Sequence, residues 1–342
     1  MAGPVVTDRH YRQVLSTALA LRQPGIEDMV SDSIPLYNVL KRKGNIRTYS
    51  GPEIRQTLRI DKQQAQWFKG YDILRNPPIE LFNDAVWTPK QIAVPISLTG
   101  EEMRANEGDT RVHDLLEGYM DGAEMSMVEA LDEGLHSDGT ADGGKQITGL
   151  AAALPTNPAT AGVYGGIDRN THALWRTSAF DAQTAFSGIG TQVNSVTIRA
   201  IFSRILSQRS RNNRAADLLV ASEEHYWAYD AATVAIQRIA RQDSLASLGF
   251  SAIEYVGGGR SAEIVLASGL NNNMPSNTTY GLETRSWQLR YHPSANFTPL
   301  FEGDGQKPIN QDAIAQFLIW GGELICINPL FSWRLFDSNP AA

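Results

Sequence analysis

The 342-residue chain contains a single cysteine, Cys326, and therefore has no second thiol for an intrachain disulfide. A chain of this kind is typical of a reducing compartment, so we expect the protein to be made and used in cytoplasm. The residues around Cys326 are apolar, which favours an inert core thiol over a catalytic nucleophile.

The chain also lacks a surplus of positive charge. It has 30 lysines and arginines against 37 aspartates and glutamates, which gives a net charge of −7. A dedicated nucleic-acid-binding protein usually has a basic excess, so this class is disfavoured, although a surface that only encloses nucleic acid is still allowed. The basic run Lys41-Arg42-Lys43 is predicted to be a solvated turn, with nucleic-acid contact as the alternative.

Long apolar runs are missing as well. The most apolar segment, Ala313 to Phe331, is interrupted by polar residues and by Gly321-Gly322-Glu323. It therefore predicts a buried strand-turn-strand, with strands at 313–320 and 323–335, and not a membrane span. The first eight residues have no basic region followed by an apolar core, so we expect no signal peptide.

The sequence does contain one long amphipathic segment, from Asp109 to Leu135. Apolar residues recur there at spacings of three and four, which predicts a helix of about 40 Å with one apolar stripe. The stripe consists of Val112, Leu115, Leu116, Tyr119, Met120, Ala123, Met127, Leu131 and Leu135. The opposite face carries Asp109, Asp114, Glu117, Asp121, Glu124, Glu129, Asp132 and Glu133. If this charged side of the helix faces solvent or a subunit boundary, assembly will depend on salt or divalent ions through screening.

Alternation typical of strands dominates the region before that helix. Apolar and polar residues alternate from Ile54 to Ile60 and again from Ile92 to Leu98, which predicts the two sides of one long β-hairpin. An isolated two-stranded ribbon is marginal in water, so we expect this hairpin to pack across another subunit.

Three aromatic residues, Trp67, Phe68 and Tyr71, lie between the two sides of the predicted hairpin. At a hairpin tip they would anchor the hairpin to a neighbouring subunit, and the alternative is that they form a small local core. Together with Lys62 and Lys69 they are our candidate residues for contacts between subunits.

The rest of the chain predicts an α+β pattern. We expect helices at 11–22, 195–209 and 223–231, the last opening at Ser222, and Val196, Ile201, Ile205 and Leu206 are predicted to face inward. Further strands are predicted at 218–221, 253–256, 263–266, 279–282 and 287–291.

A search for catalytic chemistry finds one candidate pair, Glu133 and His136, with Glu129 one helical turn away. Two such Glu-x-x-His pairs hold the metals of di-iron bundles, but no second pair occurs in this chain. We therefore expect no catalytic, metal-binding or cofactor-binding residues, and a metal-dependent enzyme is the alternative from a different class.

Two glycine-containing segments are predicted to be simple turns. Asp138-Gly-Thr-Ala-Asp142 lacks the alternating oxygen ligands of a calcium-binding loop. Gly257-Gly-Gly-Arg260 lacks the pattern of a phosphate-binding loop, so a hairpin turn is expected.

Several short segments, taken in order along the chain, resemble the major capsid proteins of tailed bacteriophages. They are Val94 to Asn106, His136 to Thr140, Gly149-Leu150, Gly165 to Asn170 with Trp175-Arg176, Leu248 to Phe250 before Tyr255, and Tyr280 to Thr284. Their order and spacing over nearly the full length carry the resemblance. In the last segment the family usually has asparagine where this chain has Glu283.

The resemblance implies the α+β Hong Kong 97-type capsid fold, with an N-terminal arm, an extended β-hairpin loop, a peripheral domain with a long spine helix, and an axial domain. The implied boundaries are 1–43 for the arm, 44–100 for the extended loop, 101–192 for the peripheral domain with its spine helix at 109–135, 193–300 for the axial domain, and 301–342 for the C-terminal strands that return to the peripheral domain.

The function that the resemblance implies is structural and not enzymatic. Subunits would form pentamers and hexamers that close into an icosahedral shell around double-stranded DNA, without sequence-specific binding and without a membrane. The shell would be assembled in the cytoplasm of a host bacterium and become part of the virion. Expected partners are further copies of the chain, a portal protein, a separate scaffolding protein and, in some members, a decoration protein. An encapsulin-like nanocompartment is the alternative within the same fold.

Two further traits of some family members can be compared with this chain. An N-terminal arm of about 43 residues is too short for a fused scaffolding region, since domains seldom fall below ~50 residues, and this favours a separate scaffolding protein. Some members also cross-link an extended-loop lysine to an asparagine of a neighbour. Lys62, Lys69 and Asn328 lie in the corresponding regions, but the sequence alone does not identify a set of residues that would react.

Overall fold

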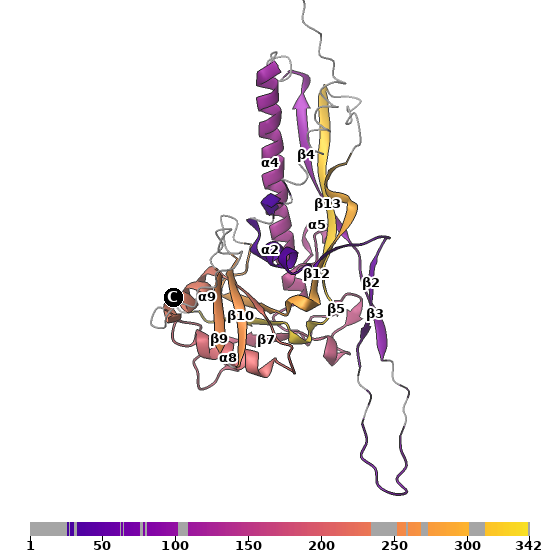
Figure 1. The fold of residues 1–342 in the computed structure, drawn as a ribbon, viewed down its shortest axis with the longest axis vertical. Coiled ribbons are helices and arrows are strands. Elements are labelled where there is room, and N and C mark those ends of the chain that lie inside the picture. The colour runs from indigo at the N-terminus through magenta and orange to yellow at the C-terminus, as the bar shows by residue number, and fades with distance from the viewer. Residues whose placement is uncertain are drawn as a thin grey trace, which may run out of the picture.

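The computed structural model describes residues 26, 28–30, 33–61, 63, 65–75, 78, 81–101, 109–233, 252–257, 259–267, 273–300 and 312–340. Three parts extend from a common centre (Figure 1): an arm formed by a long helix and two long strands, a hairpin that points the opposite way, and a lobe of shorter elements to one side. Within the described ranges, no helix is both long enough and apolar enough to span a membrane.

The arm is built on a four-stranded sheet with the strand order β1-β12-β13-β4. Its strands are β1 (Ile46–Thr48), β4 (Lys90–Thr99), β12 (Trp287–Pro299) and β13 (Ala313–Cys326). Strand β1 runs parallel to β12, and β13 is antiparallel to both β12 and β4. Leu289, Leu318 and Leu324 of this sheet are fully buried and belong to the larger of two hydrophobic cores.

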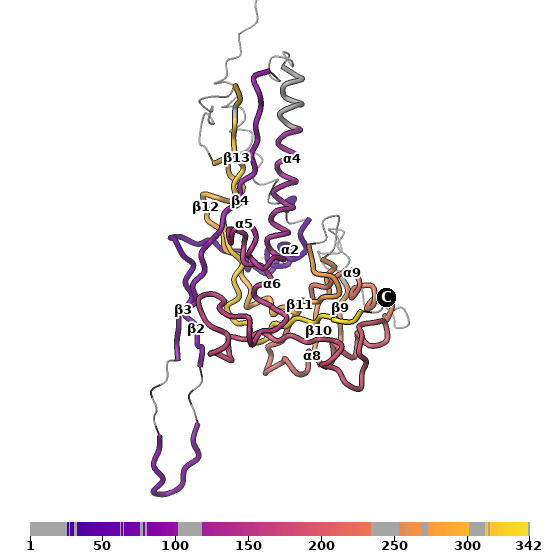
Figure 2. Tube along the Cα trace, turned by 180° about the vertical axis from the view of Figure 1, so that it is seen from behind, coloured from indigo at the N-terminus to yellow at the C-terminus, as the bar shows by residue number. Residues whose placement is uncertain are grey.

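Helix α4 (Asp109–His136) lies beside β4 and β13, as the view from behind also shows (Figure 2). The predicted long helix is therefore confirmed, and its residues Met127, Leu131 and Leu135 are completely buried. Tyr119 is an exception, with 38% of its surface exposed, because it lies about 100° around the helix from the buried Met120. The side chains of Val112, Leu115 and Leu116 lie outside the described residues.

The C-terminal strands differ from the prediction. The turn expected at Gly321-Gly322 does not form, because β13 stays paired with β4 as far as Gly322 and continues to Cys326 paired with β12. These glycines provide space, since a Cβ at Gly322 would lie 2.5 Å from the carbonyl oxygen of Arg290 on the neighbouring strand. The chain turns only after Cys326, where η3 (Pro329–Phe331) leads into β14 (Trp333–Phe336).

The hairpin consists of β2 (Ile54–Arg59) and β3 (Phe82–Trp87), which pair in antiparallel register. The prediction that residues 92–98 form its return side is wrong, because these residues belong to β4 and pair with β13. A half-buried strand alternates in the same way whichever strand it pairs with, so alternation alone could not identify the partner.

The lateral lobe contains a six-stranded sheet with the order β7-β14-β11-β8-β10-β9. Besides β14, its strands are β7 (Ser178–Asp181), β8 (Leu218–Ala221), β9 (Ala252–Gly257), β10 (Arg260–Leu266) and β11 (Thr278–Leu282). Helices α8 (Ile198–Gln208) and α9 (Glu223–Thr233) enclose the second core with this sheet. Gly257 and Arg260 pair across the turn between β9 and β10, as predicted.

The predicted inward face of α8 is correct for Ile201, Ile205 and Leu206, which are fully buried. Val196 is 85% exposed, because the helix begins only at Ile198. The predicted helix 11–22 and the segment Leu248 to Phe250 lie outside the described residues.

Short elements connect the larger ones. They are α2 (Pro35–Arg42), α5 (Ala141–Gly144), α6 (Leu150–Ala153), α7 (Ala182–Ala185), β5 (Val163–Tyr164), β6 (Ile167–Asp168), η1 (Ala173–Trp175) and η2 (Thr284–Ser286).

Gly149 lets the chain return closely against the end of α4. A Cβ at this position would lie 2.4 Å from the carbonyl oxygen of Gly134 and 2.5 Å from that of Leu135. We expect Gly149→Ala to lower the free energy of unfolding by about 1–3 kcal/mol, because backbone would have to move. Urea unfolding of the free subunit measures the change.

The matched control is Gly118→Ala in α4, where a Cβ would meet nothing within 4 Å. This variant is expected to keep or gain stability, by up to ~1 kcal/mol, because alanine favours a helix over glycine. Equal stability of Gly149→Ala and the wild type would contradict the close approach at the end of α4.

Candidate subunit interface

The far part of the hairpin carries large aromatic side chains that nothing in the described subunit covers. Trp67 and Tyr71 are fully exposed, at 102% and 106%, and Phe68 is 64% exposed. Side chains of a local core would be buried, so the alternative prediction of a small core at the tip is wrong for the isolated subunit. Apolar groups gathered on one exposed segment are typical of a surface that binds another protein.

Local hydrogen bonds give the tip a defined shape. The backbone amide of Lys69 donates to Oδ2 of Asp72 at 2.9 Å, and the amide of Asp72 donates to the carbonyl oxygen of Lys69 at 3.4 Å. The amide of Arg75 donates to Oε1 of Gln66 at 3.0 Å, which links the two sides just behind the turn. Gly70 has a φ of 60°, a value that glycine adopts at little cost, and this closes the turn.

Two of the residues in the cross-linking regions, Lys69 and Asn328, belong to the described chain. Lys62 lies outside the described residues, and Lys69 is exposed at the tip. Oδ1 of Asn328 accepts a hydrogen bond from the amide of Leu330 at 3.2 Å and caps η3.

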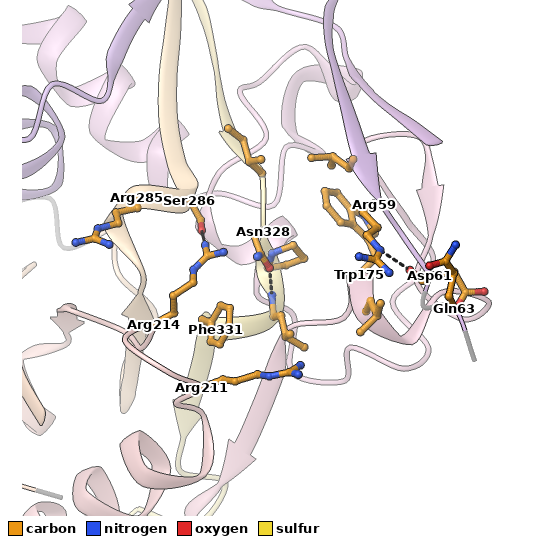
Figure 3. Close-up of a pocket in the computed structure, with 15 residues that line it drawn as sticks. Arg59, Asp61, Gln63, Trp175, Arg211, Arg214, Arg285, Ser286, Asn328 and Phe331 are labelled. Atoms are coloured by element: carbon orange, nitrogen blue, oxygen red, sulfur yellow. Dashed lines mark hydrogen bonds between the residues drawn. The ribbon is translucent and has the colours of Figure 1, made fainter. Parts of the chain in front are cut away.

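A pocket of about 630 Å³ lies at the base of the hairpin. It is lined by Leu58, Arg59, Asp61, Gln63, Leu174, Trp175, Arg211, Arg214, Arg285, Ser286, Ile327, Asn328, Pro329, Leu330 and Phe331. The close-up in Figure 3 shows Arg214, Phe331 and Asn328 on one side and Arg59 with Trp175 on the other. The pocket therefore combines an apolar wall with arginine side chains that come from distant parts of the chain.

Arg214 is fixed on one side of this pocket by Glu283. Nε of Arg214 donates to Oε1 of Glu283 at 2.6 Å, and Nη2 donates to Oε2 at 2.7 Å. These hydrogen bonds to the carboxylate raise the pKa of Arg214 and keep it charged. Glu283, the residue at which this chain departs from the resemblance, is 3% exposed and thus forms a buried half of an ion pair.

The predicted solvated turn at residues 41–43 is correct only in part, because Arg42 and Lys43 are exposed but all three residues form ion pairs. They end helix α2, and Lys41 pairs with Asp28 at 3.2 Å. Arg42 reaches Glu263 at 2.7 Å, and Lys43 reaches Asp217 at 2.6 Å. All three charges are thus paired within the subunit, and two of them, Arg42 and Lys43, join α2 to the lateral lobe.

The candidate metal residues at the end of α4 point to different partners. His136 is buried, not solvated as expected for a helix end, and its Nδ1 lies 3.4 Å from Oδ1 of Asp132. Burial alone would raise the pKa of Asp132, but hydrogen bonds with His136 and Asn273 and the charge of His136 lower it overall. Glu133 accepts instead from Gln146, and the described residues contain no group of three potential metal ligands.

Glu323 is a buried carboxyl group that sequence reasoning did not single out as functional. It is 0% exposed in β13, and its Oε1 accepts from the amide of Thr148 at 2.7 Å. Burial raises the pKa of Glu323 to about 8, an effect that its hydrogen bonds and nearby Lys90 offset only in part. Its place in an otherwise apolar strand was the available signal.

Comparison with known proteins identifies the fold. No protein-family model matches the chain, and no curated protein sequence matches it either. Among solved structures, it is similar to the capsid chain of cyanophage A-1(L), with 14% identity, a TM-score of 0.62 and coverage of 91% of this chain and 92% of that chain. The capsid chain of a native GTA particle matches with 12% identity, a TM-score of 0.53 and coverage of 91% of both chains.

A third similar structure is the capsid of Myoviridae phage XM1, at 10% identity and a TM-score of 0.50, covering 87% of this chain and 91% of that chain. The chain therefore has the Hong Kong 97-type fold of tailed-phage capsid proteins, as the sequence predicted. At these identities the likeness establishes the fold, and function is argued from the residues of this chain.

Proposed function

We propose that the chain is a major capsid protein that assembles with copies of itself into pentamers and hexamers, and that these close an icosahedral shell around double-stranded DNA. The observation that carries this proposal is the hairpin, which projects away from both cores and bears uncovered Trp67 and Tyr71. Burying these apolar side chains against another surface lowers the free energy, and this favours association with another subunit. The fold, which this chain shares with chains of phage capsids, also supports the proposal.

The proposed role is structural, in a virion assembled in the cytoplasm of a bacterial host. Many weak contacts repeated by symmetry would hold the shell together, and closure would leave no exposed edges. A separate scaffolding protein and a portal protein are the proposed assembly partners, and a decoration protein would bind outside where one is present. The domain boundaries that the resemblance implies, from the N-terminal arm to the C-terminal strands, are likewise proposed.

Electron microscopy of the purified protein tests the proposal. The chain is expressed alone and then together with the products of its neighbouring genes, and both preparations are examined in negative stain. Closed angular shells or rings of five and six subunits are expected in at least one of them. A uniform monomer or dimer in every preparation would show that the proposed function is wrong.

A further inference from the structure

The pocket at the hairpin base has a charge opposite to that of the whole chain. Arg59, Arg211, Arg214 and Arg285 line it, with Asp61 as its one lining carboxylate. Of the carboxylates in the described ranges, only Glu283 forms an ion pair with one of these arginines, and it neutralises Arg214. A chain with a net charge of −7 thus keeps three other arginines together around one pocket.

The uncommitted arginines face solvent. Arg59, Arg211 and Arg285 are all exposed, and Nε of Arg59 donates only to the backbone carbonyl of Asp61, at 3.1 Å. In Figure 3 the side chain of Arg285 points away from the middle of the pocket, whereas Arg211 lies along its lower rim and Arg59 along the opposite side. Arg59 and Arg211 are therefore the two charges best placed to meet a ligand.

An apolar wall lies between these charges. Trp175 is 3% exposed and belongs to the larger core, and Phe331 is 7% exposed, so both rings form the buried back of the wall. Leu174 and Leu330 complete the wall. A surface of this kind fits a partner that presents carboxylates together with an apolar side chain, because the arginines and the wall then each find their complement.

The chain itself carries such a surface on α4. Asp121, Met125, Glu129 and Glu133 follow one another at spacings of four residues, so they lie on one side of the helix over about 18 Å. All four are exposed, and Met125 is 61% exposed although it is apolar. We name these residues the acidic face of α4.

We propose that the acidic face of α4 in one copy docks on the arginine-lined pocket of the next copy. Met125 packs on the wall near Trp175, and Glu129 and Glu133 pair with Arg59 and Arg211. This inference rests on the proposed function and deepens it, because it names the two surfaces that join neighbouring subunits beside the hairpin.

The two surfaces belong to different copies. Helix α4 and the hairpin extend from the centre of the molecule in opposite directions (Figure 1), and Glu133 lines a separate groove that shares no residue with the arginine pocket. A contact between two different surfaces of identical copies is head-to-tail, and such contacts form rings where the rotation between copies closes and open filaments where it does not. The geometry thus agrees with five- or six-membered rings and not with an isolated two-fold dimer.

Charge reversal tests the pairing. Arg59→Glu with Arg211→Glu reverses the pocket, and Glu129→Lys with Glu133→Lys reverses the helix face. Each pair alone is expected to lower the yield of shells or rings by roughly tenfold or more, because like charges then meet at every contact. A chain that carries all four substitutions is expected to regain at least about a third of the wild-type yield, since the pairs are restored with exchanged signs.

The matched control is Arg199→Glu with Arg204→Glu, which changes the same charge on α8 away from the pocket. It is expected to assemble like the wild type, and the melting temperature of each free subunit shows whether it has folded. The proposal is overturned if either reversed pair assembles normally, or if the fourfold variant does no better than the pairs.

One other occupant of the pocket is packaged DNA. If the Arg59 and Arg211 variant forms normal shells that hold less DNA, the pocket binds phosphate and the docking proposal is wrong. Absence of any assembly by the wild type would instead contradict the proposed function itself, so the two failures are distinguishable.

Discussion

A chain in which Trp67 and Tyr71 are both replaced by serine is expected to form at least roughly tenfold fewer closed shells than the wild type. Burial of each aromatic side chain is worth ~1.5–3 kcal/mol, and a loss of ~1.4 kcal/mol per contact already weakens association tenfold. The free subunit should keep its melting temperature, because both side chains are fully exposed there and contribute no packing. Sedimentation of assembled particles, with electron microscopy of the fractions, measures the yield.

The control for this variant is Val163→Ser, which removes another exposed apolar side chain, 65% exposed, from strand β5 beside the base of the hairpin and not at its tip. It is expected to assemble normally. Normal shells from the Trp67 and Tyr71 variant would mean that the hairpin tip is not an anchor, and the assignment of Trp67, Phe68, Lys69 and Tyr71 as contact residues would fall.

Features that depend on neighbours in sequence could be predicted well. The spacing of Met120, Met127 and Leu131 identifies α4 because the period of a helix is set within a few residues. The four buried residues of β8 and the turn at Gly257 were predicted for the same reason. The hairpin tip was located because its aromatic residues follow the alternating segment that forms β2.

Features that depend on distant segments could not be predicted in this way. Strand β4 alternates as a hairpin strand would, and only its register with β13 shows the true partner. Likewise, Arg42 reads as part of a basic run until Glu263 is seen beside it, 221 positions further along the chain. The arginine pocket gathers residues from five parts of the sequence, none of which is basic enough alone to suggest a binding surface.

Glu323→Gln is expected to stabilise the free subunit at neutral and alkaline pH. Oε1 of Glu323 accepts from the amide of Thr148, which the amide oxygen of glutamine can also do. The second oxygen, Oε2, is buried without a hydrogen-bond partner among the described residues. Since burial raises the pKa of this carboxyl group to about 8, from 4.5 for an ordinary glutamate, the folded subunit binds a proton that the unfolded chain releases.

The direction of the pH effect follows from that difference. Below pH 4.5 both states hold the proton, so Glu323 imposes no penalty. Between pH 4.5 and about 8 the unfolded chain loses its proton first, and the stability of the wild type falls as the pH rises. Glutamine does not titrate, so the advantage of the variant should grow across this range to a few kcal/mol and then stay constant.

Urea unfolding at pH 5 and pH 8 measures this advantage, in the Trp67 and Tyr71 background so that assembly does not add to stability. The control is Glu129→Gln, at an exposed position in α4, and its effect on stability should be the same at both pH values. A stability difference between Glu323→Gln and its parent that is the same at both pH values would mean that Glu323 is ionised in the fold. In that case the carboxylate would need a partner or a water molecule at Oε2, and this buried position in β13 would be charged instead of neutral.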